Sequence, residues 1–237
     1  TDLSEFDAAQ QQQRLSRLQQ EHAAYRFDLE HDLMLQLHLV KLSQTQHCLL
    51  LNLHHIAADG WSVAILQQQL ADFYQQALLN QNTQRDLHAL QYADFAAWEQ
   101  QWLTQQRLQP QQQYWQQQLA GLPQLHSLPL DHPRPEKSAF AGLSYHCRLS
   151  AADLQRFGHL CQQQGASLYM GLQAALALLL SRLSQQSDIV IGTPVANRDL
   201  PELETMLGFF ANTLVMRLQC EKSQTFSELL QHSRQVA

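Results

Sequence analysis

Two adjacent histidines, followed by an acid and a glycine, form the segment of this chain that is best suited to chemistry. His54 and His55 are followed by Asp59 and Gly60. An imidazole titrates near neutral pH, so either ring could act as a general base or carry a proton. The carboxylate of Asp59 could orient an imidazole or hold a loop through an ion pair. Gly60 permits backbone angles and a close approach that a Cβ would block.

The elements around these residues decide where the two imidazoles point. The run His47–His55 is apolar on both faces, which is typical of a buried strand. Side chains alternate along a strand, so His54 and His55 should point to opposite faces, and one can pack while the other enters a cleft. A helix is expected from near Trp61, because the apolar residues that follow are spaced by three and four: Val63, Leu66, Leu70, Phe73 and Ala77.

Other interpretations of the same residues remain open. Asp59 could cap the helix that begins near Trp61, a role that aspartate fills well. The paired histidines could be structural, or they could bind a metal. Neighbouring side chains on opposite faces do not readily hold one ion, however, and no third ligand is suitably spaced. We therefore predict no metal site, while residue types and spacing by themselves leave catalysis, capping and packing open.

Composition excludes several classes of protein. The chain has 237 residues, of which 45% are apolar and 15% charged, with a net charge of −6 and 40 glutamines. A net-negative chain without clustered Lys and Arg is not expected to bind nucleic acid, and the apolar content is too high for a disordered chain. No uncharged apolar run reaches the ~18 residues that a membrane span needs. The nearest, Tyr169–Leu180, is shorter and contains Gln173.

The cysteines suggest free thiols rather than a disulfide framework. All four are far apart in the sequence and none forms a CxxC pair. Cys48 and Cys147 lie in strand-like runs, where we expect buried thiols. A reducing cytoplasm is the compartment that fits this pattern.

Periodicity predicts that helices and strands alternate, which is the α/β class. In the first half we expect a helix over residues 7–25 and a β-hairpin whose second strand lies centrally in a sheet covered on both sides. The first strand of this β-hairpin should span residues 33–40. A long helical region from Tyr92 to Leu119 should be broken or restarted at Pro110.

A proline-rich stretch over residues 122–135 divides the chain, and we place a boundary between residues 121 and 122. The elements expected beyond it follow from local patterns and capping signals. They are a strand Leu143–Leu149, a helix capped by Ser150 and stopped by Gly165, a helix from Ser167 to about Leu183 that is buried on all sides, the strands Ile189–Ile191 and Asn212–Leu218, and a helix from Phe226.

The run from Asn52 to Ser62 resembles the HHxxxDG core of the condensation domains of nonribosomal peptide synthetases. That core alone is shared with many acyltransferases, but further segments agree with the family and occur in its order, which makes the resemblance specific. These segments are Tyr92–Trp98, Tyr114-Trp115 with Leu119, Leu128–Pro135, and Ile191–Arg198 with Glu202, Glu204 and Leu207–Thr213.

The resemblance implies an α/β fold of two chloramphenicol-acetyltransferase-like lobes, each a mixed sheet with packed helices and each incomplete in this chain. Residues 1–121 would be the C-terminal part of the N-lobe, and residues 122–237 the linker and the N-terminal part of the C-lobe. The chain would then cover roughly the middle half of such a domain. In the family, the arginine that pairs with the motif's aspartate lies upstream of these segments, so Asp59 is expected to lack its partner here.

The resemblance also implies a reaction. Carrier proteins dock on both faces of such a domain and insert phosphopantetheine arms into a tunnel between the lobes, where an acceptor amine attacks a donor thioester and an amide forms. The domain would need no intrinsic cofactor. Its partners would be the donor and acceptor carrier-protein domains and a neighbouring adenylation domain, rather than nucleic acid or a membrane.

Site residues are carried over by their match to the family's motifs. The resemblance implies that His55 is the catalytic histidine, that His54 is packed and supportive, and that Asp59 is a structural ion-pairing residue. The Gly60 N–H is a candidate donor to the oxyanion. The expected tunnel residues are Trp61, Ser62, Asn197, Arg198 and Asn212.

Three alternatives belong to the same superfamily: an epimerisation domain, a CoA-dependent acyltransferase, and an inactive condensation-like domain that only recruits partners. Trp61 and Ser62 after the motif favour condensation over epimerisation. The intact His55 and Asp59 favour an enzyme over a recruiting domain. An isolated segment of this length could nevertheless lack activity.

Overall fold

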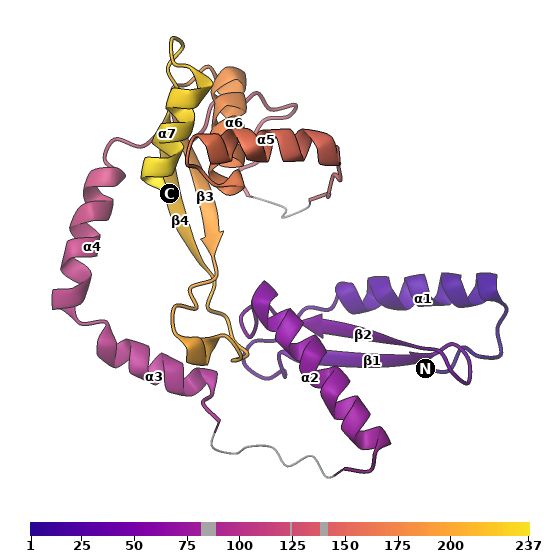
Figure 1. The fold of residues 1–237 in the computed structure, drawn as a ribbon. Coiled ribbons are helices and arrows are strands. Elements are labelled where there is room, and N and C mark those ends of the chain that lie inside the picture. The colour runs from indigo at the N-terminus through magenta and orange to yellow at the C-terminus, as the bar shows by residue number, and fades with distance from the viewer. Residues whose placement is uncertain (82–88, 124, 138–141) are drawn as a thin grey trace. The chain divides into compact units, whose positions relative to one another are not determined.

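The computed structural model of the protein describes residues 1–81, 89–123, 125–137 and 142–237. It divides into two compact units, each with helices and a two-stranded sheet. Unit 1 consists of residues 1–104 and 196–212, and unit 2 consists of residues 105–195 and 213–237 (Figure 1). The boundary expected between residues 121 and 122 stays a prediction.

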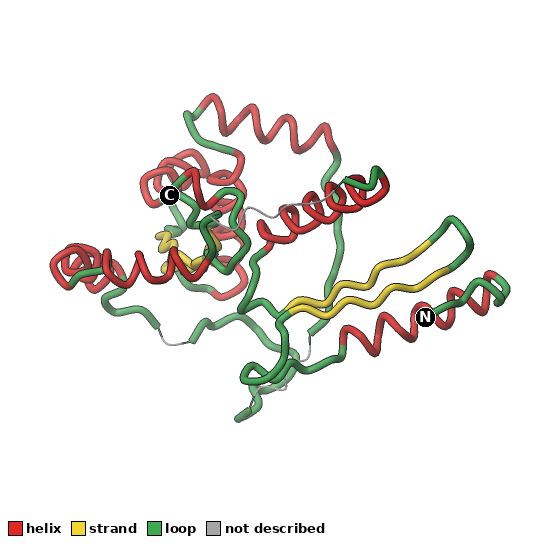
Figure 2. Tube along the Cα trace, turned by 90° about the horizontal axis from the view of Figure 1, so that it is seen from below, coloured by secondary structure: helices red, strands yellow, loops and turns green. Residues whose placement is uncertain are grey.

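Unit 1 begins with a helix that lies beside a β-hairpin. The helix α1 (Ala8–Ala23) and the strands β1 (Leu35–Lys41) and β2 (His47–Leu53) confirm the elements predicted in this region. The two strands are antiparallel and form a hairpin (Figure 2). In their register Leu35 lies opposite Leu53. Thus β2 ends directly before the two histidines.

The prediction that β2 lies in the centre of a sheet was wrong for the described residues. There β2 pairs with β1 alone, whereas β1 also forms an isolated bridge to Asp2 on its other edge. The apolar pattern of a strand reports its two faces, but its hydrogen-bonding neighbours lie in the plane of the sheet. The pattern therefore could not reveal how many strands flank β2.

The other helices of the first half are α2 (Gly60–Leu78), α3 (Tyr92–Trp102) and α4 (Gln105–Gln118). The predicted break at Pro110 was wrong, because α4 runs through this residue and the chain instead leaves the helical path at Leu103, where ψ is 70°. A proline removes one N–H, so the bond that residue 110 would donate to the carbonyl of Gln106 is missing, but the helix continues on both sides of it.

Unit 2 is built from α5 (Ala151–Gln163), α6 (Leu168–Ser184) and α7 (Phe226–Val236), with strands β3 (Asp188–Val195) and β4 (Asn212–Gln219). The predicted helix signals are confirmed. Ser150 and Ser167 cap α5 and α6, and Gly165 has the left-handed φ of +66° that ends α5. The buried core includes Cys161, Ala174, Ala177, Ile189, Leu218, Leu229 and Leu230.

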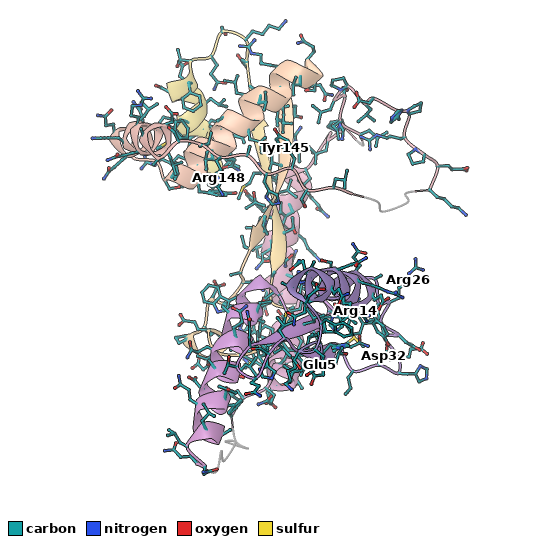
Figure 3. All side chains as sticks on the ribbon, turned by 90° about the vertical axis from the view of Figure 1, so that its right-hand side faces the viewer. Glu5, Arg14, Arg26, Asp32, Tyr145 and Arg148 are labelled. Atoms are coloured by element: carbon teal, nitrogen blue, oxygen red, sulfur yellow. The ribbon has the colours of Figure 1, made fainter. Side chains whose placement is uncertain are left out.

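Two predictions for unit 2 were wrong. The segment Leu143–Leu149, on which Figure 3 labels Tyr145, forms no strand. Cys147 on it is exposed rather than buried, and Tyr145 is 92% exposed. A strand needs a neighbour for its hydrogen bonds, and no described residue pairs with this segment. Helix α6 is buried on one side only, where α5, α7 and β3 pack against it. Several of its leucines therefore remain exposed, among them Leu172, Leu176, Leu179 and Leu183.

Among the described residues, no single helix is long and apolar enough to cross a membrane. The bent pair of α5 and α6, with 102° between them, meets the requirement for length and composition only when the two helices are taken together.

Candidate functional site

The site lies in unit 1, where β2 passes through a short turn into α2. The N–H of His54 still donates to the carbonyl of Met34, at 3.0 Å, and α2 begins at Gly60. Asp59 caps this helix, because its Oδ1 accepts the N–H of Ser62 at 2.9 Å. The capping role that the sequence left open is therefore present.

Asp59 also forms a buried ion pair with Arg198. The Nη2 of Arg198 lies 3.1 Å from Oδ1 and 3.3 Å from Oδ2 of Asp59, and the two side chains are only 2% and 3% exposed. The expectation that Asp59 lacks its partner was wrong. The partner lies 139 residues downstream, in the segment 196–212 that folds into unit 1, instead of upstream as the resemblance implied.

The guanidinium of Arg198 holds its own loop as well. Its Nη1 donates to the carbonyls of Leu203 and Met206, the latter at 2.7 Å, and its Nη2 donates to Ser62 Oγ at 2.9 Å. The group also lies 4.2 Å from the ring centre of Phe210. One buried cation therefore connects the start of α2 with the segment 196–212.

The surroundings of Asp59 keep its carboxylate ionised. Burial favours the neutral acid, but this effect is outweighed by hydrogen bonds from the backbone of Ser62, the backbone of Phe210 and the side chain of Arg198. The pKa of Asp59 is lowered to about 2. Asp59 is therefore an anion that stabilises structure at neutral pH, rather than an acid that can donate a proton.

Gly208 is a residue of the site that the sequence patterns did not single out. Its carbonyl accepts the N–H of Asp59 at 3.1 Å and the hydroxyl of Ser62 at 2.8 Å. A Cβ at this position would lie 2.1 Å from Cδ2 of Tyr92, so no larger side chain fits without displacing that ring. Its place inside the family-like run Leu207–Thr213 was the signal that could have found it.

Helix α3 packs on the same loop. Tyr92 donates its hydroxyl to the carbonyl of Phe209 at 2.9 Å, and its ring lies edge-on to Phe210, with centroids 5.1 Å apart. Phe95 also contacts Phe210, with a centroid separation of 4.9 Å. The aromatic motif of this helix thus holds the loop segment that carries Arg198.

The two histidines have different surroundings. His54 is half-buried, its Nδ1 accepts the N–H of Ile56 at 3.1 Å, and its ring lies edge-on to Phe27. His55 is exposed, and neither of its ring nitrogens has a hydrogen-bond partner among the described residues. Its ring lies edge-on to Phe209, with centroids 5.2 Å apart. The ring of His54 is therefore hydrogen-bonded within the fold, whereas the ring of His55 is exposed.

Of the remaining site residues, Ser62 and Arg198 are buried within the network around Asp59. Gly60 is exposed at the first position of α2, and a Cβ on it would meet no heavy atom within 4 Å, so the fold itself does not require a glycine there. Trp61 is half-exposed and donates Nε1–H to the carbonyl of Glu204 at 2.9 Å.

Asn197 and Asn212 lie near the two ends of the segment 196–212, where Asn197 is exposed and Asn212 is exposed at the start of β4. Asn197 has a left-handed φ of +53°, directly before Arg198. Among the described residues, no three His, Cys, Asp or Glu side chains form a group that could hold a metal ion.

Comparison with known proteins identifies the family of this chain. The family model for the condensation domain matches residues 1–237. The chain belongs to the condensation-domain family. Malpinin synthetase of Mortierella alpina is 37% identical to this condensation-domain chain over 227 residues, which are 96% of this chain and 3% of that protein. Phosphinothricin tripeptide synthetase PhsC of Streptomyces viridochromogenes is 37% identical over 210 residues, which are 89% of this chain and 19% of that protein.

Solved structures share the fold. The X-domain in the complex of the X-domain and OxyB from teicoplanin biosynthesis matches with a TM-score of 0.87 and 33% identity, over 94% of this condensation-domain chain and 50% of that chain. The first condensation domain of the calcium-dependent antibiotic synthetase matches with a TM-score of 0.76 and 21% identity. The match covers 99% of this chain and 53% of that chain. These matches confirm the predicted α/β fold, and the chain spans about half the length of these structures.

Proposed function

We propose that this condensation-domain chain catalyses amide bond formation between aminoacyl or peptidyl thioesters carried by carrier proteins during nonribosomal peptide synthesis. The observation that carries the proposal is the exposed imidazole of His55, whose ring nitrogens have no hydrogen-bond partner in the part of the chain that the structure describes, and which contacts Phe209 next to the buried pair of Asp59 and Arg198. Membership of the family and the similarity to a tripeptide synthetase support it.

The residues suit each step of this reaction. The acceptor amine must be uncharged when it attacks the donor carbonyl, and His55 accepts its proton or holds it in line. The new C–N bond forms while negative charge develops on the carbonyl oxygen, and the Gly60 N–H, which has no acceptor within the helix, donates to that oxygen. Collapse of the intermediate breaks the C–S bond, and the pantetheine thiolate leaves with the proton.

The substrates in this proposal arrive on phosphopantetheine arms, so the domain needs no other cofactor. Its partners are a donor and an acceptor carrier-protein domain, with an adenylation domain as neighbour. Trp61, Asn197 and Asn212 are the exposed residues that we propose to face the substrate tunnel, because each lies next to a residue of the site or at an end of its loop.

The test is His55→Ala in the full-length synthetase that contains this chain, with both carrier proteins loaded and the dipeptidyl product measured by mass spectrometry. We expect the product to disappear. The matched control is His47→Ala, an exposed histidine at the start of β2, which should leave product formation intact. Unchanged product from the His55 variant would overturn the proposal.

A second candidate is a domain that recruits a partner without catalysis. The observation that favours it is the match to an X-domain solved in complex with OxyB. It would gain support if the intact domain bound loaded carrier proteins but gave no product. Epimerisation, a third possibility, would change the chirality of one loaded amino acid and leave the mass of the carrier protein unchanged.

A further inference from the structure

The imidazole of His55 makes an aromatic contact with Phe209. Among the described residues its ring nitrogens have no partner, and its ring meets Phe209 at a centroid distance of 5.2 Å and an interplanar angle of 87°. This edge-to-face arrangement is one that aromatic pairs favour. An exposed imidazole without such a contact would sample several rotamers.

Phe209 is itself fixed on both sides by buried groups. The preceding carbonyl, of Gly208, accepts the N–H of Asp59 at 3.1 Å. The following N–H, of Phe210, donates to Asp59 Oδ2 at 3.1 Å. The carbonyl of Phe209 accepts the hydroxyl of Tyr92 at 2.9 Å. The backbone that presents this ring therefore has little freedom, although Phe209 as a residue is 39% exposed.

We propose that Phe209 is a positioning residue for the imidazole of His55, and that Asp59 and Arg198 influence the reaction through Phe209 without touching the substrate. This inference rests on the proposed function. Reaction rates depend steeply on how well a base is aligned with its substrate, so a loop that fixes the imidazole contributes to the rate even when it binds nothing.

An apolar ring is well suited to this task. A polar neighbour would accept or donate a hydrogen bond at one nitrogen of His55, and would so fix its tautomer and occupy the atom that the substrate needs. The ring of Phe209 restricts the direction of the imidazole and leaves both nitrogens free. His54 has the opposite arrangement, since its Nδ1 is bound to the backbone of Ile56.

The experiment compares Phe209→Leu with Phe209→Tyr in the full-length synthetase. Leucine keeps an apolar side chain without a ring, and we expect kcat to fall about tenfold or more while KM changes by less than about threefold. Tyrosine keeps the ring and should restore most of the rate. The matched control is Phe27→Leu, which removes the corresponding ring from His54 and should change kcat by less than about threefold.

A second measurement does not depend on turnover. The rate at which diethylpyrocarbonate modifies His55, followed by peptide mass spectrometry, should rise in Phe209→Leu and stay at the parent value in Phe209→Tyr.

The double variant Asp59→Asn with Phe209→Leu should lose less rate than the product of the two single losses, because both changes disturb the same alignment. Fully multiplicative losses would contradict the action of Asp59 through Phe209.

The two proposals fail in different ways. If His55→Ala leaves the product unchanged, the proposed function is wrong. If His55→Ala abolishes the product while Phe209→Leu keeps both the parent kcat and the parent modification rate of His55, the function stands and the positioning role of Phe209 is wrong.

Discussion

Ser62 and Gly208, which are 146 residues apart in the chain, exchange two hydrogen bonds. The hydroxyl of Ser62 donates to the carbonyl of Gly208 at 2.8 Å and accepts its N–H at 3.1 Å. The same oxygen accepts a bond from Arg198, and the side chain is fully buried. Ser62, in the first turn of α2, thus links the end of the histidine motif to the segment 196–212 by hydrogen bonds.

Removing this hydroxyl should destabilise unit 1. In Ser62→Ala the N–H of Gly208 and one N–H of Arg198 lose a buried acceptor, and each loss costs about 1–3 kcal/mol, so we expect a fall of about 2–6 kcal/mol in the free energy of unfolding. Urea denaturation measures this difference in the free energy of unfolding between Ser62→Ala and the parent. Ser227→Ala, on the exposed side of α7, is the control and should change stability by less than about 0.5 kcal/mol. Equal stability of both variants would contradict the role of Ser62.

The ionisation of Asp59 should be visible in the pH dependence of stability. Its pKa is about 2 in the folded protein, below the ordinary value of 3.8. Because the folded pKa is the lower one, the stabilisation is complete above about pH 4 and is lost as the pH falls to about 2, which amounts to about 2 kcal/mol. Urea denaturation over this range should show a shallower acid loss for Asp59→Asn than for the parent. Identical slopes in the two proteins would contradict the lowered pKa of Asp59 in the folded state.

Removing Arg198 from the ion pair with Asp59 should lower the free energy of unfolding more than protonating Asp59 does. In Arg198→Met the carboxylate of Asp59 stays buried without its counter-charge, and we expect a loss of about 3–5 kcal/mol. The control is Arg17→Met, which breaks the exposed pair with Glu21 and should cost less than about 1 kcal/mol. Chemical denaturation compares the two, and a similar small loss in both would contradict the burial of the Asp59–Arg198 pair.

Gly60 offers a test that separates folding from chemistry. The structure leaves open space around its Cα, so Gly60→Ala should keep the parent stability, while the added methyl projects into the space where we propose that the substrate binds. We expect a lower rate of dipeptide formation with an unchanged melting temperature. Gly158→Ala, also in open space but within α5, should stabilise the helix by about 0.5–1 kcal/mol and leave the rate unchanged. A parent rate in Gly60→Ala would contradict the proposal that the substrate binds beside Gly60.

Local signals predicted local structure well. The caps at Ser150 and Ser167 and the helix stop at Gly165 depend on residues within one turn, and all three are present. The strand expected at Leu143–Leu149 failed because an extended run is a strand only where a neighbour pairs with it.

Relationships between distant residues were beyond the sequence pattern. The order of motifs placed Arg198 and the run Leu207–Thr213 in the same family segment, as expected of a condensation domain. It did not show that this arginine meets Asp59, or that Gly208 meets Ser62, because nothing in the residue types encodes a contact across more than a hundred residues.

Unit 1 is made from two stretches of chain with most of unit 2 encoded between them. Any recombination crossover between residues 63 and 197 would therefore inherit Asp59 and Ser62 from one parent, but Arg198, Gly208 and Phe209 from the other. Hybrid synthetases joined in this interval would carry a mixed network around His55. Hybrids that take residues 1–104 and 196–212 from the same parent would keep it intact.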